Sequence, residues 1–230
     1  QISVVSALGM APIPGATVTI SYTGDPDSPI ETLTTDESGQ TPEINLKAPP
    51  RELSLTPDIT EQPYSEYNIQ VTADGFETVL VSGSEILAGA YSLQPIRMNP
   101  LDVTEEEEKV VVIPPHTLFG EYPPKIPEEE IKPMNETGEI VLSRVVIPEY
   151  VIVHDGDPED PTARNYWVRY KDYIKNVASS EIYPTWPESA IYANILVIQS
   201  FTLNRVYTEW YRGKGYDFTI TSSTAYDQKW

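Results

Sequence analysis

The chain has 230 residues, a formal net charge of −20 at pH 7 and no cysteine. So negative a charge argues against nucleic-acid binding, because few cations are available to neutralise phosphates. The lack of cysteine excludes disulfides and thiolate metal sites. The length allows one large domain or two modest ones, and no apolar run approaches the length of a membrane span.

The negative charge is unevenly distributed along the chain. Residues 1–100 carry 3 basic and 13 acidic side chains, residues 101–139 carry 3 and 11, and residues 140–230 carry 9 and 11. The last part is therefore close to neutral. Such a surface suits an uncharged or mildly anionic polymer better than a strongly acidic one would.

The first hundred residues are expected to be all-β. Short runs rich in β-branched residues recur between turn signals, and no long helical period interrupts them. The turn signals are DESG at 36–39 and ADG at 73–75. The pattern predicts a small antiparallel sandwich with strands at 2–5, 17–20, 31–35, 67–72 and 78–81.

Three segments of this part carry a family resemblance. They are PIPGATVTI at 12–20, TDESGQ at 35–40 and YNIQVTADGF at 67–76. Together they resemble the carboxypeptidase regulatory-like domain, a transthyretin-like β-sandwich that serves as an accessory module on extracellular and surface proteins. The resemblance implies a fold and no catalysis.

Residues 101–139 are expected to be an acidic, proline-rich connector. The glutamate run at 105–108, the proline pairs at 114–115 and 123–124, and PEEE at 127–130 favour an extended chain without a core. The apolar run VVVI at 110–113 leaves open that part of the connector packs as a strand on one neighbour. A connector of this kind is also where a protease could cut.

The chain changes character after the connector, and residues 140–230 are expected to be an α+β domain. A TxxE pattern formed by Thr185 and Glu188 predicts a capping box for the second helix, with Pro187 in its first turn. No signal in 222–230 ends a domain, so this domain is expected to be incomplete at its C-terminus. The expected elements are strands at 140–142, 145–153 and 216–221, a loop at 154–161, and helices near 170–182 and 187–211.

One glutamate at the end of the first of these helices stands out. Ile174, Val177, Ala178 and Glu181 are spaced i, i+3, i+4 and i+7, so Glu181 lies on the apolar face. Burial and the negative end of the helix dipole both disfavour ionisation and would raise the pKa of this carboxyl. A glutamate protonated near neutral pH can serve as a general acid for glycosidic cleavage. The competing interpretation is a frayed helix end with Glu181 in solvent.

The residues around Glu181 resemble a known enzyme family. EIYPTWPESA at 181–190, GYD at 215–217 and TSST at 221–224 resemble the stage II sporulation protein D (SpoIID/LytB-like) peptidoglycan lytic transglycosylases. IPEYVIVHDG at 147–156 and SFTLNRVYTEW at 200–210 are similar to the catalytic part of clostridial-type spore cortex-lytic enzymes. The resemblance covers roughly residues 140–230.

The resemblance implies a mechanism and a set of residues. Glu181 would protonate the glycosidic oxygen between N-acetylmuramic acid and N-acetylglucosamine, then act as base while the C6 hydroxyl attacks and leaves a 1,6-anhydro end. A hydrolase would usually need a second carboxylate, for which Glu188 and Asp217 are the candidates. The residues expected to bind substrate are Tyr183, Trp186, Gln199, Ser200, Tyr216, Asp217, Ser222 and Ser223.

The chain also departs from the family. Some members bind zinc with Cys and His where this chain has Thr219, Thr221, Ser222 and Ser223, so neither a metal nor another cofactor is expected. Gln199 stands where the family usually has Arg. An incomplete domain would lack part of the cleft, and such a fragment could be inactive.

The remaining polar candidates have simpler interpretations. His154, beside Asp155 and Asp157, is expected to lie in a solvated turn, and His116 to be incidental in the connector. Asn204 and Arg205 are expected on a solvated helix face.

Two hypotheses follow from the sequence. The first is a peptidoglycan lytic transglycosylase of the spore cortex or extracytoplasmic cell wall, made as a precursor that an activating protease cuts. Its partner would be peptidoglycan glycan strands. The alternative is a non-catalytic binding or structural module of the cell wall or spore.

Overall fold

A computed structural model describes residues 1–56, 59–101, 108–126 and 144–230. These described residues form a mixed α+β structure with several β-sheets and two α-helices. The chain divides into two compact units, Gln1–Pro115 and His116–Trp230. The expected strand at 140–142 and most of the glutamate run at 105–108 lie outside the described residues.

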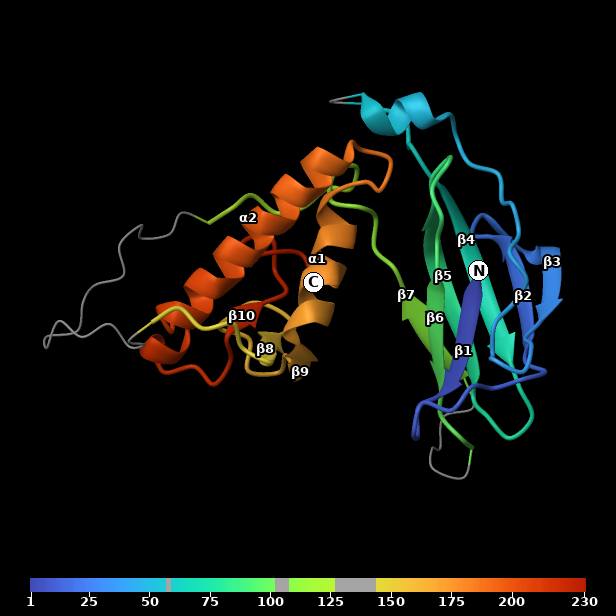
Figure 1. The fold of residues 1–230 in the computed structure, drawn as a ribbon, viewed down its shortest axis with the longest axis horizontal. Coiled ribbons are helices and arrows are strands. Elements are labelled where there is room, and N and C mark those ends of the chain that lie inside the picture. The colour runs from blue at the N-terminus through green and yellow to red at the C-terminus, as the bar shows by residue number, and fades with distance from the viewer. Residues whose placement is uncertain (57–58, 102–107, 127–143) are drawn as a thin grey trace, which may run out of the picture. The chain divides into compact units, whose positions relative to one another are not determined.

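The residues described in the first unit form a five-stranded sheet and a two-stranded sheet (Figure 1). Strands were expected at five places, and the structure confirms a strand at each. The pairing is not wholly antiparallel as expected, because β7 runs parallel to β5 and β1 parallel to β6. The larger sheet has the order β3 (Asp25–Thr34), β2 (Thr17–Tyr22), β4 (Ser65–Thr72), β5 (Thr78–Ile86) and β7 (Glu108–Val112), the smaller pairs β1 (Ile2–Ser6) with β6 (Gln94–Met98), and a 3-10 helix spans Arg51–Leu55.

Both strands of the smaller sheet and the central strands of the larger sheet bury one side in a shared core. Because side chains alternate along a strand, the apolar residues at every second position fall on the same face. The fully buried members include Val4 of β1, Val18 and Ile20 of β2, Val71 of β4 and Met98 of β6.

The edge strand β7 comes from the predicted connector. Ile113, the residue after β7, donates its N–H to the carbonyl of Ser82 over 2.8 Å. Gly83 makes this close approach possible, because a Cβ added there would lie 2.6 Å from the Ile113 carbonyl oxygen. Its φ of +87° is also a left-handed conformation that favours glycine. The apolar run at 110–113 therefore packs as a strand, the alternative that the sequence left open, and the first unit extends to Pro115 instead of residue 100.

In the described part of the second unit, two α-helices pack on a three-stranded sheet. Figure 1 shows α1 and α2 beside each other. Both helices were expected; β9 was not, and the expected strands at 145–153 and 216–221 are shorter than predicted. The sheet has the order β10 (Ile220–Thr221), β8 (Tyr150–His154) and β9 (Asn165–Arg169), and the helices are α1 (Tyr170–Glu181), α2 (Glu188–Tyr207) and the 3-10 helix Arg212–Lys214.

The two faces of this sheet are covered by different parts of the chain. Val151 and Val153 of β8 face the helices and pack with buried residues of α1 and α2. Ile152 points the other way and packs with Trp210, Tyr211 and Phe218, which follow α2. We call these the helix face and the outer face of the sheet.

The ends of α2 differ from expectation. The helix begins at Glu188 with Pro187 as N-cap, so Thr185 and Glu188 do not form the predicted capping box. At the other end Glu209 adopts a left-handed conformation, with φ of +46°. Trp210 then donates its N–H to the carbonyl of Arg205 over 3.1 Å, which is the closing hydrogen bond of a Schellman motif with glutamate in the usual place of glycine.

Candidate functional site

Helix α1 brings Glu181 to the edge of the core. The helix buries Tyr173, Ile174 and Val177 against the sheet and α2. Glu181 is its last residue and is partly buried, on the side that the i, i+7 spacing from Ile174 predicts. The structure therefore does not have the frayed helix end, with Glu181 in solvent, that was the competing interpretation.

Burial is the main influence on the Glu181 carboxyl. It raises the pKa of Glu181 above the ordinary value, while a hydrogen bond from Asn194 and the positive charge of Lys125 act in the opposite direction. The Asn194 Oδ1 atom is itself buried and has no hydrogen-bond partner among the described residues. A carboxyl in this setting holds its proton to higher pH than an exposed glutamate does, as a general acid requires.

Residues 116–117 pack against the same end of α1. The N–H and hydroxyl of Thr117 both donate to the carbonyl of Ser180, the first over 3.3 Å. The His116 ring lies 4.2 Å from the Tyr183 ring, centroid to centroid. Burial lowers the pKa of His116 to about 4, although the nearby carbonyls of Ser179 and Ile182 favour its charged form. His116 is therefore packed within the second unit and does not lie in an extended connector.

Residues 125 and 126 hydrogen-bond to the last residues of the chain. Lys125 Nζ donates to the carbonyls of Tyr226 and Asp227, each over 2.9 Å, and lies 5.5 Å from the centre of the Phe201 ring. Ile126 donates its N–H to the carbonyl of Ala225 over 2.8 Å. Residues 116–126, which we call the 116–126 segment, thus belong to the unit that contains Glu181.

Two of the residues expected to bind substrate are close to Glu181 in sequence but differ in exposure. Tyr183 is 4% exposed and packs against His116, so its ring is not available to a sugar in this structure, contrary to expectation. Trp186 is partly exposed, in a turn where it donates its N–H to the Tyr183 carbonyl over 3.1 Å.

The two expected polar residues on α2 are also accessible to different degrees. Ser200 is exposed, and its hydroxyl donates to the carbonyl of Leu196 over 2.7 Å. Gln199 is partly exposed.

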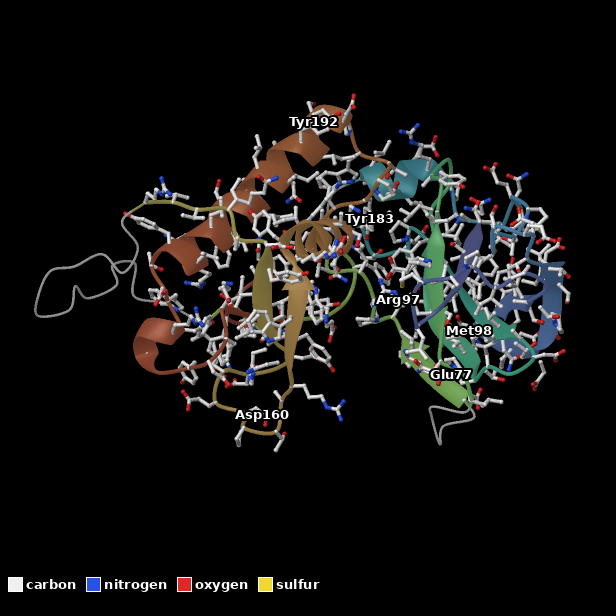
Figure 2. The ribbon with its side chains drawn as sticks, turned by 60° about the horizontal axis from the view of Figure 1, so that its bottom comes forward. Glu77, Arg97, Met98, Asp160, Tyr183 and Tyr192 are labelled. Carbon is white, nitrogen blue, oxygen red and sulfur yellow. The ribbon has the colours of Figure 1, made fainter. Side chains whose placement is uncertain are left out.

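Three other expected residues, Tyr216, Asp217 and Ser222, form hydrogen bonds with residues in and beside the loop after β8. Tyr216 donates its hydroxyl proton to Glu159. Asp217 Oδ1 accepts from Asn165 over 2.8 Å, and Ser222 donates to Asp155 over 2.9 Å. In Figure 2, Asp160 of this loop lies at the opposite end of the unit from Tyr183 and Tyr192. The expected site residues therefore fall into two groups.

Ser223 and His154 have structural roles. The Ser223 hydroxyl accepts from the N–H of Ala225 over 3.3 Å, within the turn before the last residues. His154 is buried instead of solvated: Nδ1 lies 2.7 Å from Asn165 Oδ1, and the ring stacks on Phe218 with centroids 4.4 Å apart.

Both candidate second carboxylates have hydrogen-bond partners other than Glu181. Glu188 accepts a hydrogen bond from the hydroxyl of Tyr192, and Asp217 accepts from Asn165. In the parts of the chain that the structure describes, no group of three or more Cys, His, Asp or Glu could hold a metal ion. A search of the same residues finds no helix with the length and apolarity to cross a membrane.

The sequence alone did not single out Asn194, Lys125 or His116. Asn194 approaches Glu181 because α1 and α2 pack together, and no periodicity within one helix predicts a contact between two helices. Lys125 and His116 lie in a stretch whose prolines and charge predicted a connector. The only available signal for Asn194 was its place in the segment that resembles the transglycosylases.

No protein-family model matches the chain, and a search of curated proteins finds no match either. The resemblances therefore rest on the residues that carry them.

Proposed function

We propose that the chain is a peptidoglycan lytic transglycosylase in which Glu181 acts first as acid and then as base. The single observation that supports this best is the partly buried Glu181 carboxyl, whose pKa is raised by burial and which hydrogen-bonds to Asn194. The family resemblance of residues 181–190 supplies the reaction, and the position of Glu181 supplies a suitable acid.

The proposed reaction needs one carboxyl group. Glu181 donates its proton to the glycosidic oxygen as the bond from that oxygen to C1 of N-acetylmuramic acid breaks. The Glu181 carboxylate then takes the proton of the C6 hydroxyl, whose oxygen forms the new bond to C1. Glu181 ends protonated again, and the product carries a 1,6-anhydro ring. The Asn194 amide would hold the carboxyl in place and stabilise its ionised form between the two steps.

Substrate contacts near Glu181 are proposed for the accessible residues. Trp186 is partly exposed in the turn after α1 and presents an aromatic surface for a sugar ring. Gln199 and Ser200 lie on α2, five and six residues beyond Asn194. We do not extend this role to the buried Tyr183.

We further propose that the chain is a precursor activated by a protease, and the 116–126 segment supports this. Thr117 is bonded to the end of α1 beside Glu181, and Lys125 lies close enough to affect its pKa. A glycan strand would have to share this surface with the segment. The first unit would then be a transthyretin-like accessory sandwich, and the enzyme would act in the spore cortex or extracytoplasmic cell wall.

Mass spectrometry of digested peptidoglycan tests the activity. The full chain, before and after limited proteolysis, is incubated with purified cortex peptidoglycan, and the soluble products are analysed. The proposal expects 1,6-anhydro-muramic ends, in larger amount after proteolysis. Reducing muramic ends would instead indicate a hydrolase. Binding to the polymer without any released product would favour the non-catalytic module.

A further inference from the structure

The outer face of the sheet in the second unit carries an exposed tryptophan. Trp167 of β9 is 72% exposed. It pairs with Ile152 of β8, and directly paired residues of antiparallel strands point to the same side of the sheet. Since Ile152 packs with Trp210 and Phe218 on the outer face, Trp167 lies on the outer face too, away from α1.

Tyr150 and Arg169 extend this aromatic surface. They are the neighbouring pair on the same face, two residues along each strand from Ile152 and Trp167. Tyr150 is 38% exposed, and Arg169 hydrogen-bonds to its hydroxyl oxygen. An indole, a phenol and a guanidinium thus lie side by side on one accessible sheet face. We call these three residues the Trp167 platform.

A cavity continues from the platform. Its volume is about 290 Å³, close to the lower end of the range for small-molecule sites, which is roughly 300 Å³. Tyr150 belongs to both the platform and the cavity wall. The other lining residues include Pro148, Glu209, Tyr211, Arg212 and Thr219.

The platform and cavity are separate from Glu181. Helix α1 covers the helix face, whereas the platform is on the outer face. Arg205 lines the cavity, and it lies eleven residues beyond Asn194 on α2. At a rise of 1.5 Å per residue, the two positions are about 16 Å apart along the helix axis.

The charge of this surface fits an uncharged polymer. Arg169 and Arg212 are exposed cations of this surface. The carboxylates of Glu149 and Asp172 attract the Arg169 guanidinium electrostatically, and the acidic residue Glu209 lines the cavity. Charges of both signs thus roughly balance here, in a chain whose net charge is −20. Flat aromatic side chains stack on the apolar faces of sugar rings, and the arginines can donate to hydroxyl and acetamido oxygens.

We propose that the Trp167 platform and its cavity form an accessory site for a chain of N-acetylated amino sugars. The choice of this carbohydrate rests on the proposed function. The platform would stack on sugar rings and the cavity would take a substituent of one ring. Such a site would hold the polymer on the outer face while Glu181 acts elsewhere in the same unit.

Binding of a defined oligosaccharide to the full chain tests this proposal. The probe is an N-acetylglucosamine hexamer, titrated by calorimetry against Glu181→Gln protein so that no turnover occurs. Adding Trp167→Ala should weaken binding by about five- to tenfold, because a stacking contact of this kind is lost. Trp167→Phe should retain most of the affinity. Tyr192→Ala is the matched control, since Tyr192 is 58% exposed on α2 of the same unit and should leave binding unchanged (Figure 2).

The outcomes separate this proposal from the proposed function. An affinity unchanged by Trp167→Ala would overturn the accessory site, even if the parent protein releases anhydro products. A Trp167-dependent affinity supports the site, even if no product is found. If Trp167→Ala instead lowers the molecular mass measured by sedimentation, the platform is an interface between two copies, and the proposal is wrong.

Discussion

Arg205 Nε donates a hydrogen bond to Asp227 Oδ1 over 2.7 Å, and both side chains are almost completely buried. The second oxygen, Asp227 Oδ2, accepts from the hydroxyl of Tyr211 over 2.7 Å and from the N–H and hydroxyl of Thr221, each over 2.8 Å. One carboxylate therefore joins α2, the segment after it, β10 and the last residues of the chain. The solvated helix face expected for Arg205 is wrong.

Removing this carboxylate should strongly destabilise the second unit. Asp227→Ala leaves a buried guanidinium without its counter-ion, and we expect a loss of about 3–5 kcal/mol in the free energy of unfolding. All four tryptophans lie in the second unit, so tryptophan fluorescence during urea unfolding reports on it.

Asp172→Ala is the matched control for this prediction. Asp172 pairs with Lys175 over 3.8 Å, but both side chains are mostly exposed, and exposed pairs contribute about 1 kcal/mol at most. Equal losses for the two variants would contradict the role given to Asp227.

The buried His116 predicts a loss of stability in acid. Its folded pKa is about 4, below the value of about 6.5 expected in the unfolded chain. The unfolded state therefore binds the proton more readily, and stability should fall as the pH drops from about 6.5 to about 4. The loss from this residue should reach about 3 kcal/mol. His116→Phe should be less sensitive to acid over this range, as measured by urea unfolding at several pH values. Identical pH dependence in the two proteins would refute the assignment.

Gly83 should control whether β7 stays attached to the first unit. Gly83→Ala places a Cβ against the Ile113 carbonyl and imposes a left-handed conformation on alanine. We expect faster amide hydrogen exchange at residues 108–113. Gly75→Ala is the control, because Gly75 has a similar φ of +79° but nothing within 4 Å of the added Cβ. Its cost should be about 1 kcal/mol, without selective loss of protection in β7.

Asn194 should set the pH range of the proposed activity. Its hydrogen bond lowers the pKa of Glu181, so Asn194→Ala should raise that pKa further. The alkaline limb of the rate profile, where Glu181 loses its proton, should then move to higher pH. Measuring kcat/KM against pH on soluble glycan strands checks this. A shift to lower pH would contradict the proposed contact.

The sequence predicts the strands and helices better than it predicts the contacts between them. The strands of the first unit follow from alternation, and α1 follows from the helical period around Ile174 and Val177; both are local signals. The Asp227 network and the Asn194–Glu181 contact join residues from separate elements, and no local pattern encodes them. Composition predicts a connector for His116 and for residues 110–113, whereas the ring contact of His116 with Tyr183 and the backbone pairing of β7 with β5 place them in the two units.

The rate of glycan cleavage by Glu181→Gln is the most direct measurement of the central claim. Glutamine keeps the size of the side chain but can neither donate nor accept the required proton. We expect anhydro-muramic products to fall at least about a hundredfold, the usual contribution of a general acid or base. Glu188→Gln, the control, should remain near the parent rate, and both proteins should stay folded by tryptophan fluorescence. Undiminished cleavage by Glu181→Gln would contradict the mechanism.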